Sequence, residues 1–394
     1  MQIRTYNGET TEFEVSVQGY ENLVALPALI DCHVHFRTPG QEHKEDWGSG
    51  ARAALAGGVT TVCDMPNNAP GTTTATLLQA KKRLVSAQLA EAAIPLRHYF
   101  FIGATPNNEA ELRRSVAQSV GIKLFMGSST GDLLVHKTVD QERLFALAAE
   151  LGLPLCLHAE DETTIRDNQA QIPHPKLADH SVIRSSLAAV RALSRAIELA
   201  DRHQTTIYVL HTSTRGEMEL IRDAKKSNVR IFAETTPHHL FLSTDDYARL
   251  GTKAQMNPPL RTRADQTALW EAIHDGTIDT VATDHAPHTL QEKSVPYPNS
   301  PSGVPGIETM LPLLLDASSR GLLSLAQIAA LTHRNPEKIF GLPTNTDWVI
   351  VDLDKTKMVE NRFLKTKCGW SPFDSQVLRG WPVCTILEGR PYYF

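Results

Sequence analysis

The sequence predicts an α/β protein whose main body is a (β/α)8 TIM-type barrel, with a small β appendage formed by the two termini. Two observations lead to this fold class. Apolar segments of strand length alternate with segments of helical composition along most of the chain, and both ends carry short β-like runs separated by Gly, Pro and Asn. Strands that are each followed by a crossover indicate a barrel, whereas an open doubly wound sheet typically carries a Gly-x-Gly-x-x-Gly turn that this sequence lacks.

The predicted strands share a nearly continuous apolar character, as expected for strands buried on both faces. They cover residues 23–31, 59–65, 97–104, 120–126, 153–160, 205–212, 229–235 and 277–284. Helical composition predicts helices over 74–93, 140–151, 181–203 and 264–276. We therefore expect the barrel at 27–343, with an N-terminal β segment of the appendage at 1–26 and a C-terminal one at 344–394.

Charge and composition argue against several classes of protein. The 394 residues carry a net charge of −5 with both signs interspersed, which disfavours nucleic acid and anionic membranes as partners. The five cysteines are scattered without a Cys-x-x-Cys pair, which is typical of reduced thiols in a cytoplasmic protein. There is no apolar signal core and no run of about 18 apolar residues. We expect a cytoplasmic protein that acts on a small-molecule substrate, and a homodimer remains open.

The first barrel strand runs into an unusual stretch, "ALIDCHVHFRTPG" at 28–40. His33, His35 and Arg37 occupy alternate positions, so they face one side if the strand continues that far. A His-x-His pair alone is more often structural or exposed than metal-binding. Whether this stretch is functional therefore depends on which residues end the other predicted strands.

Further polar residues occur at the ends of the other predicted strands. The fourth strand contains Lys123, the fifth ends in His158, the sixth in His211 and the eighth in Asp284. Each has an ordinary structural explanation when taken alone, such as a buried hydrogen-bonded histidine or an aspartate that caps a helix. The carboxyl ends of barrel strands meet at the catalytic face, so their joint occurrence there indicates an active site.

Imidazole and carboxylate ligands suit zinc, and a catalytic zinc keeps one position open for water or substrate. Four histidines and one aspartate are more ligands than one zinc with an open position needs. They include no group left to bridge two zinc ions. Lys123 lies among Ile, Leu, Phe and Met, where desolvation lowers the pKa of an ammonium. Its neutral amine can react with carbon dioxide, and the resulting carbamate can bridge two metals. We therefore expect two Zn²⁺ ions bridged by N6-carboxylated Lys123.

Distinctive motifs are spread over nearly the whole chain. They are "DCHVHFRTPGQEHKED", "GGVTTVCDMPNN", "GIKLFMG", "LHAED", "LHTST", "TTPHHLFL", "MNPPLR", "ATDHAPH", "SGVPGIET" and "KCGWSPFD". On these motifs the chain resembles the amidohydrolase superfamily and, within it, the dihydroorotase family. The resemblance implies a zinc-dependent enzyme of de novo pyrimidine biosynthesis that interconverts dihydroorotate and N-carbamoyl-L-aspartate.

The resemblance also implies a role for each site residue. The implied metal ligands are His33 and His35 on the first metal, His158 and His211 on the second, carboxylated Lys123 as the bridge, and Asp284 on the first metal. The implied substrate contacts are Arg37, Asn67 and His288 for the carboxylate, with Asn257 and the backbone near Ser302 and Gly303 for the ring amides. The "PSGVPG" stretch varies within the family, and "GIKLFMG" matches its lysine-bridged kind instead of the kind that carries an aspartate bridge.

The implied chemistry assigns separate tasks to Asp284 and Arg37. Asp284 acts as general base and then general acid, and Arg37 holds the substrate carboxylate with two hydrogen bonds. Two alternatives stay open. A hydantoinase or allantoinase shares the metal ligands but not the carboxylate-binding residues. A non-catalytic barrel that serves as a scaffold is disfavoured because all six ligand positions are filled.

Overall fold

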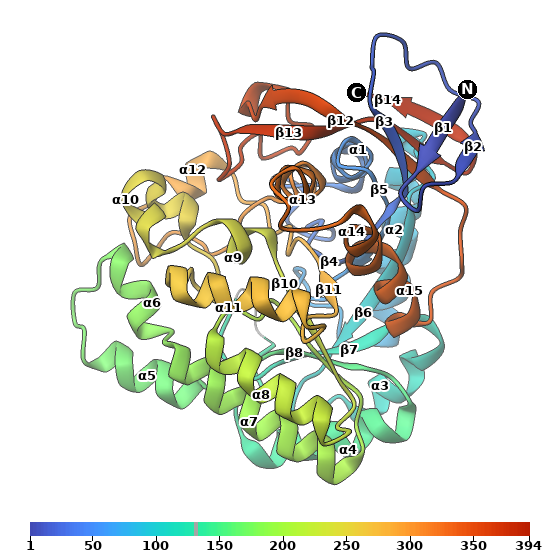
Figure 1. Ribbon diagram of the computed structural model, residues 1–394. Coiled ribbons are helices and arrows are strands. Elements are labelled where there is room, and N and C mark those ends of the chain that lie inside the picture. Colours follow the sequence, from blue (N-terminus) through green and yellow to red (C-terminus); the bar gives the residue numbers. More distant parts are fainter. Residues whose placement is uncertain (130–132) are drawn as a thin grey trace.

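The main body of the protein is a barrel of parallel strands, seen in a computed structural model that describes residues 1–129 and 133–394 (Figure 1). Within these residues the barrel strands follow one another in sequence order. They are β4 (Leu29–Val34), β5 (Val59–Asp64), β6 (Arg97–Gly103), β7 (Gly121–Phe125), β8 (Leu155–His158), β9 (Ile207–Val209), β10 (Ile231–Thr235) and β11 (Thr280–Val281). A bridge between Val34 and His285 closes the circle. The predicted fold class is confirmed.

A second sheet joins the two ends of the chain, which lie near each other in Figure 1. Its order is β14-β13-β12-β3-β1-β2. Its strands are β1 (Gln2–Thr5), β2 (Thr10–Glu12), β3 (Leu23–Pro27), β12 (Trp348–Met358), β13 (Val377–Leu387) and β14 (Arg390–Tyr393). The single strand expected over 23–31 was wrong, because its first half pairs with β12 and β1 in this sheet and only its second half enters the barrel.

Helices cover the outside of the barrel (Figure 1). They are α1 (Trp47–Ala56), α2 (Ala75–Ala92), α3 (Glu109–Ser115), α4 (Thr138–Leu151), α5 (Glu162–Ala170), α6 (His180–Ile183), α7 (Ser186–His203), α8 (Arg215–Lys226), α9 (Pro237–Phe241), α10 (Tyr247–Leu250), α11 (Arg263–His274), α12 (Leu290–Lys293), α13 (Met310–Ser319), α14 (Leu325–Ala329) and α15 (Asn335–Phe340). The helix expected over 181–203 is interrupted at Arg184, whose ψ of 61° leaves the helical region. The Arg184 side chain at this break is buried.

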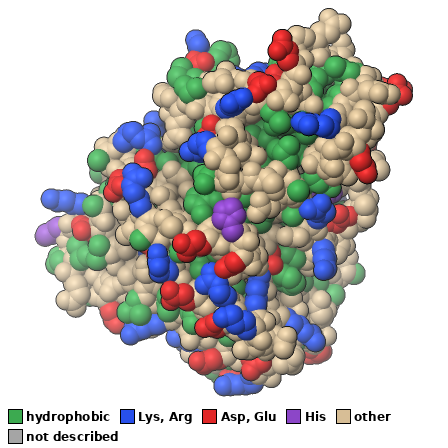
Figure 2. Space-filling view, viewed as in Figure 1, with side chains coloured by type: hydrophobic (Ala, Val, Ile, Leu, Met, Phe, Trp, Pro, Cys, Tyr) green, Lys and Arg blue, Asp and Glu red, His purple; other side chains and the backbone are tan. Residues whose placement is uncertain are grey.

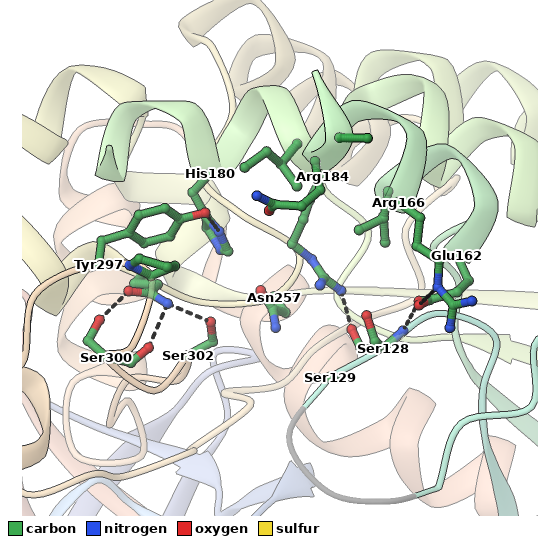
Figure 3. Close-up of a pocket in the computed structure, with 16 residues that line it drawn as sticks. Ser128, Ser129, Glu162, Arg166, His180, Arg184, Asn257, Tyr297, Ser300 and Ser302 are labelled. Atoms are coloured by element: carbon green, nitrogen blue, oxygen red, sulfur yellow. Dashed lines mark hydrogen bonds and ion pairs between the residues drawn. The ribbon is translucent and has the colours of Figure 1, made fainter. Parts of the chain in front are cut away.

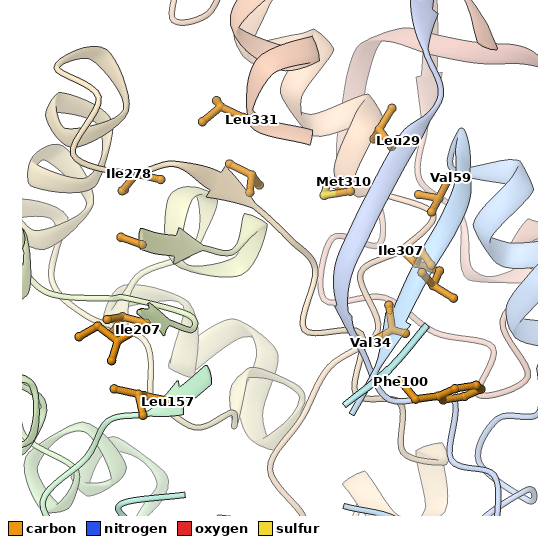
Figure 4. Packing of buried hydrophobic residues seen from close by; sticks show 14 of the residues in the cluster. Leu29, Val34, Val59, Phe100, Leu157, Ile207, Ile278, Ile307, Met310 and Leu331 are labelled. Atoms are coloured by element: carbon orange, nitrogen blue, oxygen red, sulfur yellow. The ribbon is translucent and has the colours of Figure 1, made fainter. Parts of the chain in front are cut away.

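Two apolar clusters hold the barrel together. The larger one lies between strands and helices and includes Leu29, Val59 and Leu157 from strands and Met310 from α13 (Figure 4). A smaller cluster fills the barrel interior. It takes side chains from neighbouring strands, such as Cys63, Phe101, Cys156 and Tyr208. This packing supports the ends of the strands, where the polar residues lie.

Charged side chains of both signs alternate over the face of the molecule in Figure 2, without a region of a single sign. In the part of the chain that the structure describes, no helix has the length and apolar character needed to cross a membrane. All five cysteines are buried and unbonded to one another, as their scatter in the sequence predicted.

Candidate active site

The polar residues predicted at the strand ends gather around one small cavity of about 30 Å³. Its lining consists of His33, His35, Arg37, Asn67, Lys123, Phe125, Ser129, His158, His211, Asn257, Asp284, Ala286, Ser302 and Gly303. Of the predicted site residues, His288 alone is outside this lining, and it contacts Arg37 from behind. The topology has thus brought together residues that are up to 270 positions apart in the chain.

His33, His35 and Asp284 form the tightest cluster at this cavity. Oδ1 of Asp284 lies 3.3 Å from Nε2 of His33 and 2.9 Å from Nε2 of His35. Burial alone would raise the pKa of Asp284, yet the two histidines hold it well below its ordinary value. Burial also lowers the pKa of His35 to about 3, which keeps this imidazole neutral. One ligand atom from each residue lies within 4.8 Å of the others, as a shared metal ion requires.

The sequence analysis did not find Glu234, which orients this cluster. Oε1 of Glu234 lies 2.7 Å from Nδ1 of His33 and accepts a hydrogen bond from the His211 backbone N–H at 3.1 Å. Its other oxygen accepts from the Tyr208 hydroxyl at 2.9 Å. A carboxylate on Nδ1 leaves the Nε2 lone pair of a histidine available for a metal. The available signal was a carboxylate inside the otherwise apolar strand "IFAET".

His158 and His211 form a second pair across the cavity. Nδ1 of His158 lies 3.1 Å from Nε2 of His211. Burial lowers the pKa of both imidazoles, and their proximity to each other strengthens this for His211. Both rings are therefore neutral at ordinary pH, and each turns a nitrogen toward the same small space.

Glu160 and Arg184 support His158 and were also missed from the sequence. Oε2 of Glu160 lies 2.9 Å from Nε2 of His158 and accepts from Nε of Arg184 at 3.0 Å. Burial would raise the pKa of Glu160, but Arg184 and His158 hold it well below its ordinary value. Arg184 also donates to the Ser128 carbonyl at 2.5 Å, a contact visible in Figure 3. His158, like His33, is therefore in contact with a buried carboxylate.

Lys123 belongs to β7, is buried, and lines the same cavity as the two histidine groups. Its Nζ lies over the Phe125 ring, 4.5 Å from the centroid. Burial lowers the pKa of Lys123 to about 8, against the attraction of Asp284 and Glu234. Much more of this side chain is then a neutral amine at neutral pH than for an exposed lysine, although the ammonium still predominates at pH 7.

The donor set fits a metal centre. Neutral imidazole nitrogens and one carboxylate are ligands that zinc prefers. His211 Nδ1 has no hydrogen-bond partner among the described residues. Carboxylates behind His33 and His158 match the outer contacts that commonly orient metal-binding histidines. The coarse prediction of a metal site is supported by this geometry.

Three residues of the site depart from strand geometry. Arg37, His211 and Asp284 have φ values of 62°, 40° and 43°, in the left-handed region that side-chain-bearing residues rarely adopt. The first strand does not continue as far as Arg37, since β4 ends at Val34, so the condition for a shared strand face is not met. Arg37 nevertheless lines the cavity because its backbone turns there. Strain of this kind is typical of functional sites.

The segment that follows Asp284 contacts the Arg37 side chain. Its Nε donates to the Pro287 carbonyl at 3.0 Å, and its Nη2 lies 3.2 Å from Nε2 of His288. Nζ of Lys44, another residue that the sequence analysis missed, lies 3.2 Å from Nδ1 of His288. Burial lowers the pKa of Arg37 to about 10, so the guanidinium stays charged at neutral pH. The cavity is therefore lined by a fixed cation as well as by His33, His35 and Asp284.

A larger cavity of about 610 Å³ adjoins the small one (Figure 3). Ser129, Asn257 and Ser302 line both cavities. His180, Arg184 and Tyr297 line only the larger one. The larger cavity therefore lies next to the polar cluster and shares part of its lining. His238 is buried, its Nε2 has no hydrogen-bond partner among the described residues, and it lies outside both linings.

Comparison with known proteins agrees with this geometry. The model of the amidohydrolase family matches residues 24–347. The chain is 37% identical to a dihydroorotase of Halobacterium salinarum over 97% of this chain and 89% of that protein. It is 38% identical to a dihydroorotase of Methanosarcina mazei, over 93% and 83% of the two chains. Among solved structures, an L-hydantoinase (dihydropyrimidinase) of Arthrobacter aurescens matches with a TM-score of 0.88 and 27% identity, over 96% and 88% of the chains.

Proposed function

Since the chain belongs to the amidohydrolase family and is a cyclic amide hydrolase, we propose that its substrate is dihydroorotate. It would hydrolyse this ring reversibly to N-carbamoyl-L-aspartate in pyrimidine biosynthesis. The observation that carries the proposal is the place of Arg37. This buried guanidinium lines the same cavity as His33, His35 and Asp284. A cation fixed there suits a cyclic amide that bears a carboxylate.

The proposed metal centre holds two Zn²⁺ ions. His33, His35 and Asp284 would bind the first, His158 and His211 the second, and Lys123 would bridge them as its carbamate. When bound, these ions would lower the pKa of a water molecule and polarise the ring carbonyl. The lowered pKa of Lys123 supports the modification, because the neutral amine is the form that reacts with carbon dioxide.

Asp284 is the proposed catalytic residue. Its carboxylate takes the proton of the attacking water and returns it to the ring nitrogen as the C–N bond breaks, and ring closure reverses these steps. The lowered pKa of Asp284 keeps the carboxylate ionised at neutral pH, the state in which it can accept a proton. Its contacts with His33 and His35 hold the carboxylate in one position.

The proposed substrate contacts divide into two groups. Arg37 and Asn67 would hold the carboxylate, with His288 acting through its contact with Arg37. A planar guanidinium can donate two parallel hydrogen bonds to a carboxylate. Asn257 and the backbone at Ser302 and Gly303 would contact the ring amides, since both segments line the cavity.

A hydantoinase is the alternative that a specific observation favours, namely the fold of the Arthrobacter aurescens enzyme. Purified protein loaded with zinc should be assayed for ring opening of dihydroorotate, hydantoin and allantoin under identical conditions. The proposal expects dihydroorotate to have the highest kcat/KM. Faster turnover of hydantoin or allantoin would overturn it.

A further inference from the structure

The wall between the two cavities is built from two chain segments far apart in sequence, 255–257 and 300–303. Ser300 and Ser302 of the second segment lie together at one side of the larger cavity in Figure 3. Ser302 and Gly303 also face the small cavity, as does Asn257 of the first segment. Neither segment belongs to a helix or strand. Their shape must therefore be fixed by contacts outside regular secondary structure.

Lys293, the last residue of the short helix α12, lies where these two segments meet. Its side chain is 1% exposed. Nζ donates to the carbonyls of Gln255 at 3.0 Å, Pro301 at 2.8 Å and Gly303 at 3.2 Å. An ammonium has three N–H donors and no acceptor, so these three bonds use its full capacity. Burial and the charge of Arg37 lower the pKa of Lys293 to about 7, so these bonds only partly compensate for the water that the ammonium loses.

The Gln255 side chain and backbone complete the connection. Its carbonyl accepts a second hydrogen bond, from the Gly303 N–H at 2.9 Å. Its side-chain Nε2 donates to the Ser300 carbonyl at 2.8 Å, and Oε1 accepts from the Ser300 hydroxyl. The two segments are therefore joined at several points, and the Lys293 side chain contacts both.

Gly303 shows how tightly the wall is packed. Its φ is +137°, and a Cβ added there would lie 2.6 Å from the Ala286 carbonyl oxygen. The segment passes against the chain that follows Asp284, and the Ala286 N–H donates to the Val304 carbonyl at 2.9 Å. A shift of this wall would therefore move the surface that faces the substrate ring.

We infer that Lys293 is a positioning residue for the substrate ring, which it serves by holding segments 255–257 and 300–303 together. This inference rests on the proposed function, because it assigns the ring contacts to Asn257, Ser302 and Gly303. Lys293 contacts neither the cavity nor the proposed metal ligands. Its influence on the reaction is indirect, and it should act on binding of the ring.

The test compares Lys293→Met and Lys293→Arg with the unmodified full-length protein, each loaded with zinc. Ring contacts present in both the ground state and the transition state affect KM more than kcat. Lys293→Met should therefore raise KM about tenfold and leave kcat within about threefold, with an unchanged metal content. Lys293→Arg should not restore KM, because a planar guanidinium cannot direct three N–H groups to this tripod of carbonyls.

Hydrogen exchange gives a second readout that does not depend on turnover. Amides in 252–257 and 299–304 should exchange faster in Lys293→Met, while those of the barrel strands keep their rates. Gln255→Ala, which retains Lys293 but removes the side-chain bonds to Ser300, should raise KM in the same direction. It also provides a measurement if Lys293→Met does not fold.

Ile350→Ala is the matched control. Ile350 is fully buried, but it belongs to β12 of the second sheet and not to the two segments. The substitution should lower the Tm without changing KM. An unchanged KM in folded, metal-loaded Lys293→Met would overturn the inference, as would faster exchange throughout the barrel. Failure of the proposed function is seen separately, as absent dihydroorotate turnover by the unmodified protein. The variants are then compared on hydantoin, where the same KM increase is expected.

Discussion

Oε1 of Glu234 lies 2.7 Å from Nδ1 of His33 and 3.1 Å from the backbone nitrogen of His211, so one carboxylate contacts two residues of the proposed metal centre. Glu234→Gln keeps the shape of the side chain and removes its charge. Zinc affinity should fall about 10- to 100-fold, as for other carboxylates behind metal-binding histidines. Competition with a chromogenic chelator measures this change directly.

The control for Glu234→Gln is Asp347→Asn, since Asp347 is also a buried carboxylate but pairs with Arg97 away from the site. Its zinc affinity should match that of the unmodified protein. Activity of Glu234→Gln should recover when zinc is added in excess. Equal zinc affinities in Glu234→Gln and the unmodified protein would show that the carboxylate does not tune the metal centre.

Asp284→Asn tests the proposed proton transfer. An amide can still contact His33 and His35, so much of the bound metal should remain, but it cannot take up a proton. We expect kcat to fall on the order of 1,000-fold or more. Single-turnover kinetics together with metal analysis separates the two effects. A variant that retains its metal and near-normal turnover would exclude Asp284 as the base.

The sequence predicted the barrel and most of the site because both follow from local patterns. Apolar strand-length runs identify the strands, and their carboxyl ends must meet, so His33, His158 and Asp284 could be grouped without a structure. Glu234 was missed because its partner His33 is 201 positions away, and nothing local to either residue records that contact. The division of 23–31 was missed for the same reason, since pairing with β12 decides it. The assigned roles of the site residues stay predictions.

Arg37→Lys keeps the positive charge and loses the planar pair of donors. A bidentate charge-assisted contact contributes roughly 1.5–3 kcal/mol, so kcat/KM for dihydroorotate should fall about ten- to hundredfold. Turnover of 5,6-dihydrouracil, which lacks the carboxylate, should change far less. The zinc content should be unchanged, and loss of zinc would mean that Arg37 supports the metal centre instead.

Lys123→Ala removes the proposed bridge. Without its carbamate the two metal positions lose a shared anionic ligand, so bound zinc should fall from two ions per chain to one or none, and activity should nearly vanish. Short carboxylic acids should restore some activity to this variant only where they can take the place of the bridge. In the unmodified, metallated protein, high-resolution density at Lys123 should show a planar three-atom extension. A bare lysine side chain in a fully active protein would contradict the bridge.

Lys81 and Asp64 form an ion pair, and neither side chain is exposed. Asp64 accepts a hydrogen bond from the Phe36 N–H at 2.7 Å, next to Arg37. Lys81 donates to the Met65 carbonyl at 2.9 Å, near Asn67. Lys81→Met leaves the Asp64 carboxylate buried without its partner, which should reduce the free energy of unfolding by about 3–5 kcal/mol.

A second substitution distinguishes the lost charge pairing from lost packing around Lys81. Asp64→Asn added to Lys81→Met removes the unpaired charge while an amide oxygen can still accept from the Phe36 N–H. The cost of Lys81→Met arises mainly from an uncompensated buried charge, so the double variant should recover at least half of the lost stability. Urea unfolding of all variants at equal zinc loading measures this coupling. If the losses of the single variants simply add in the double variant, Asp64 and Lys81 stabilise the fold independently, and pairing of their charges does not contribute.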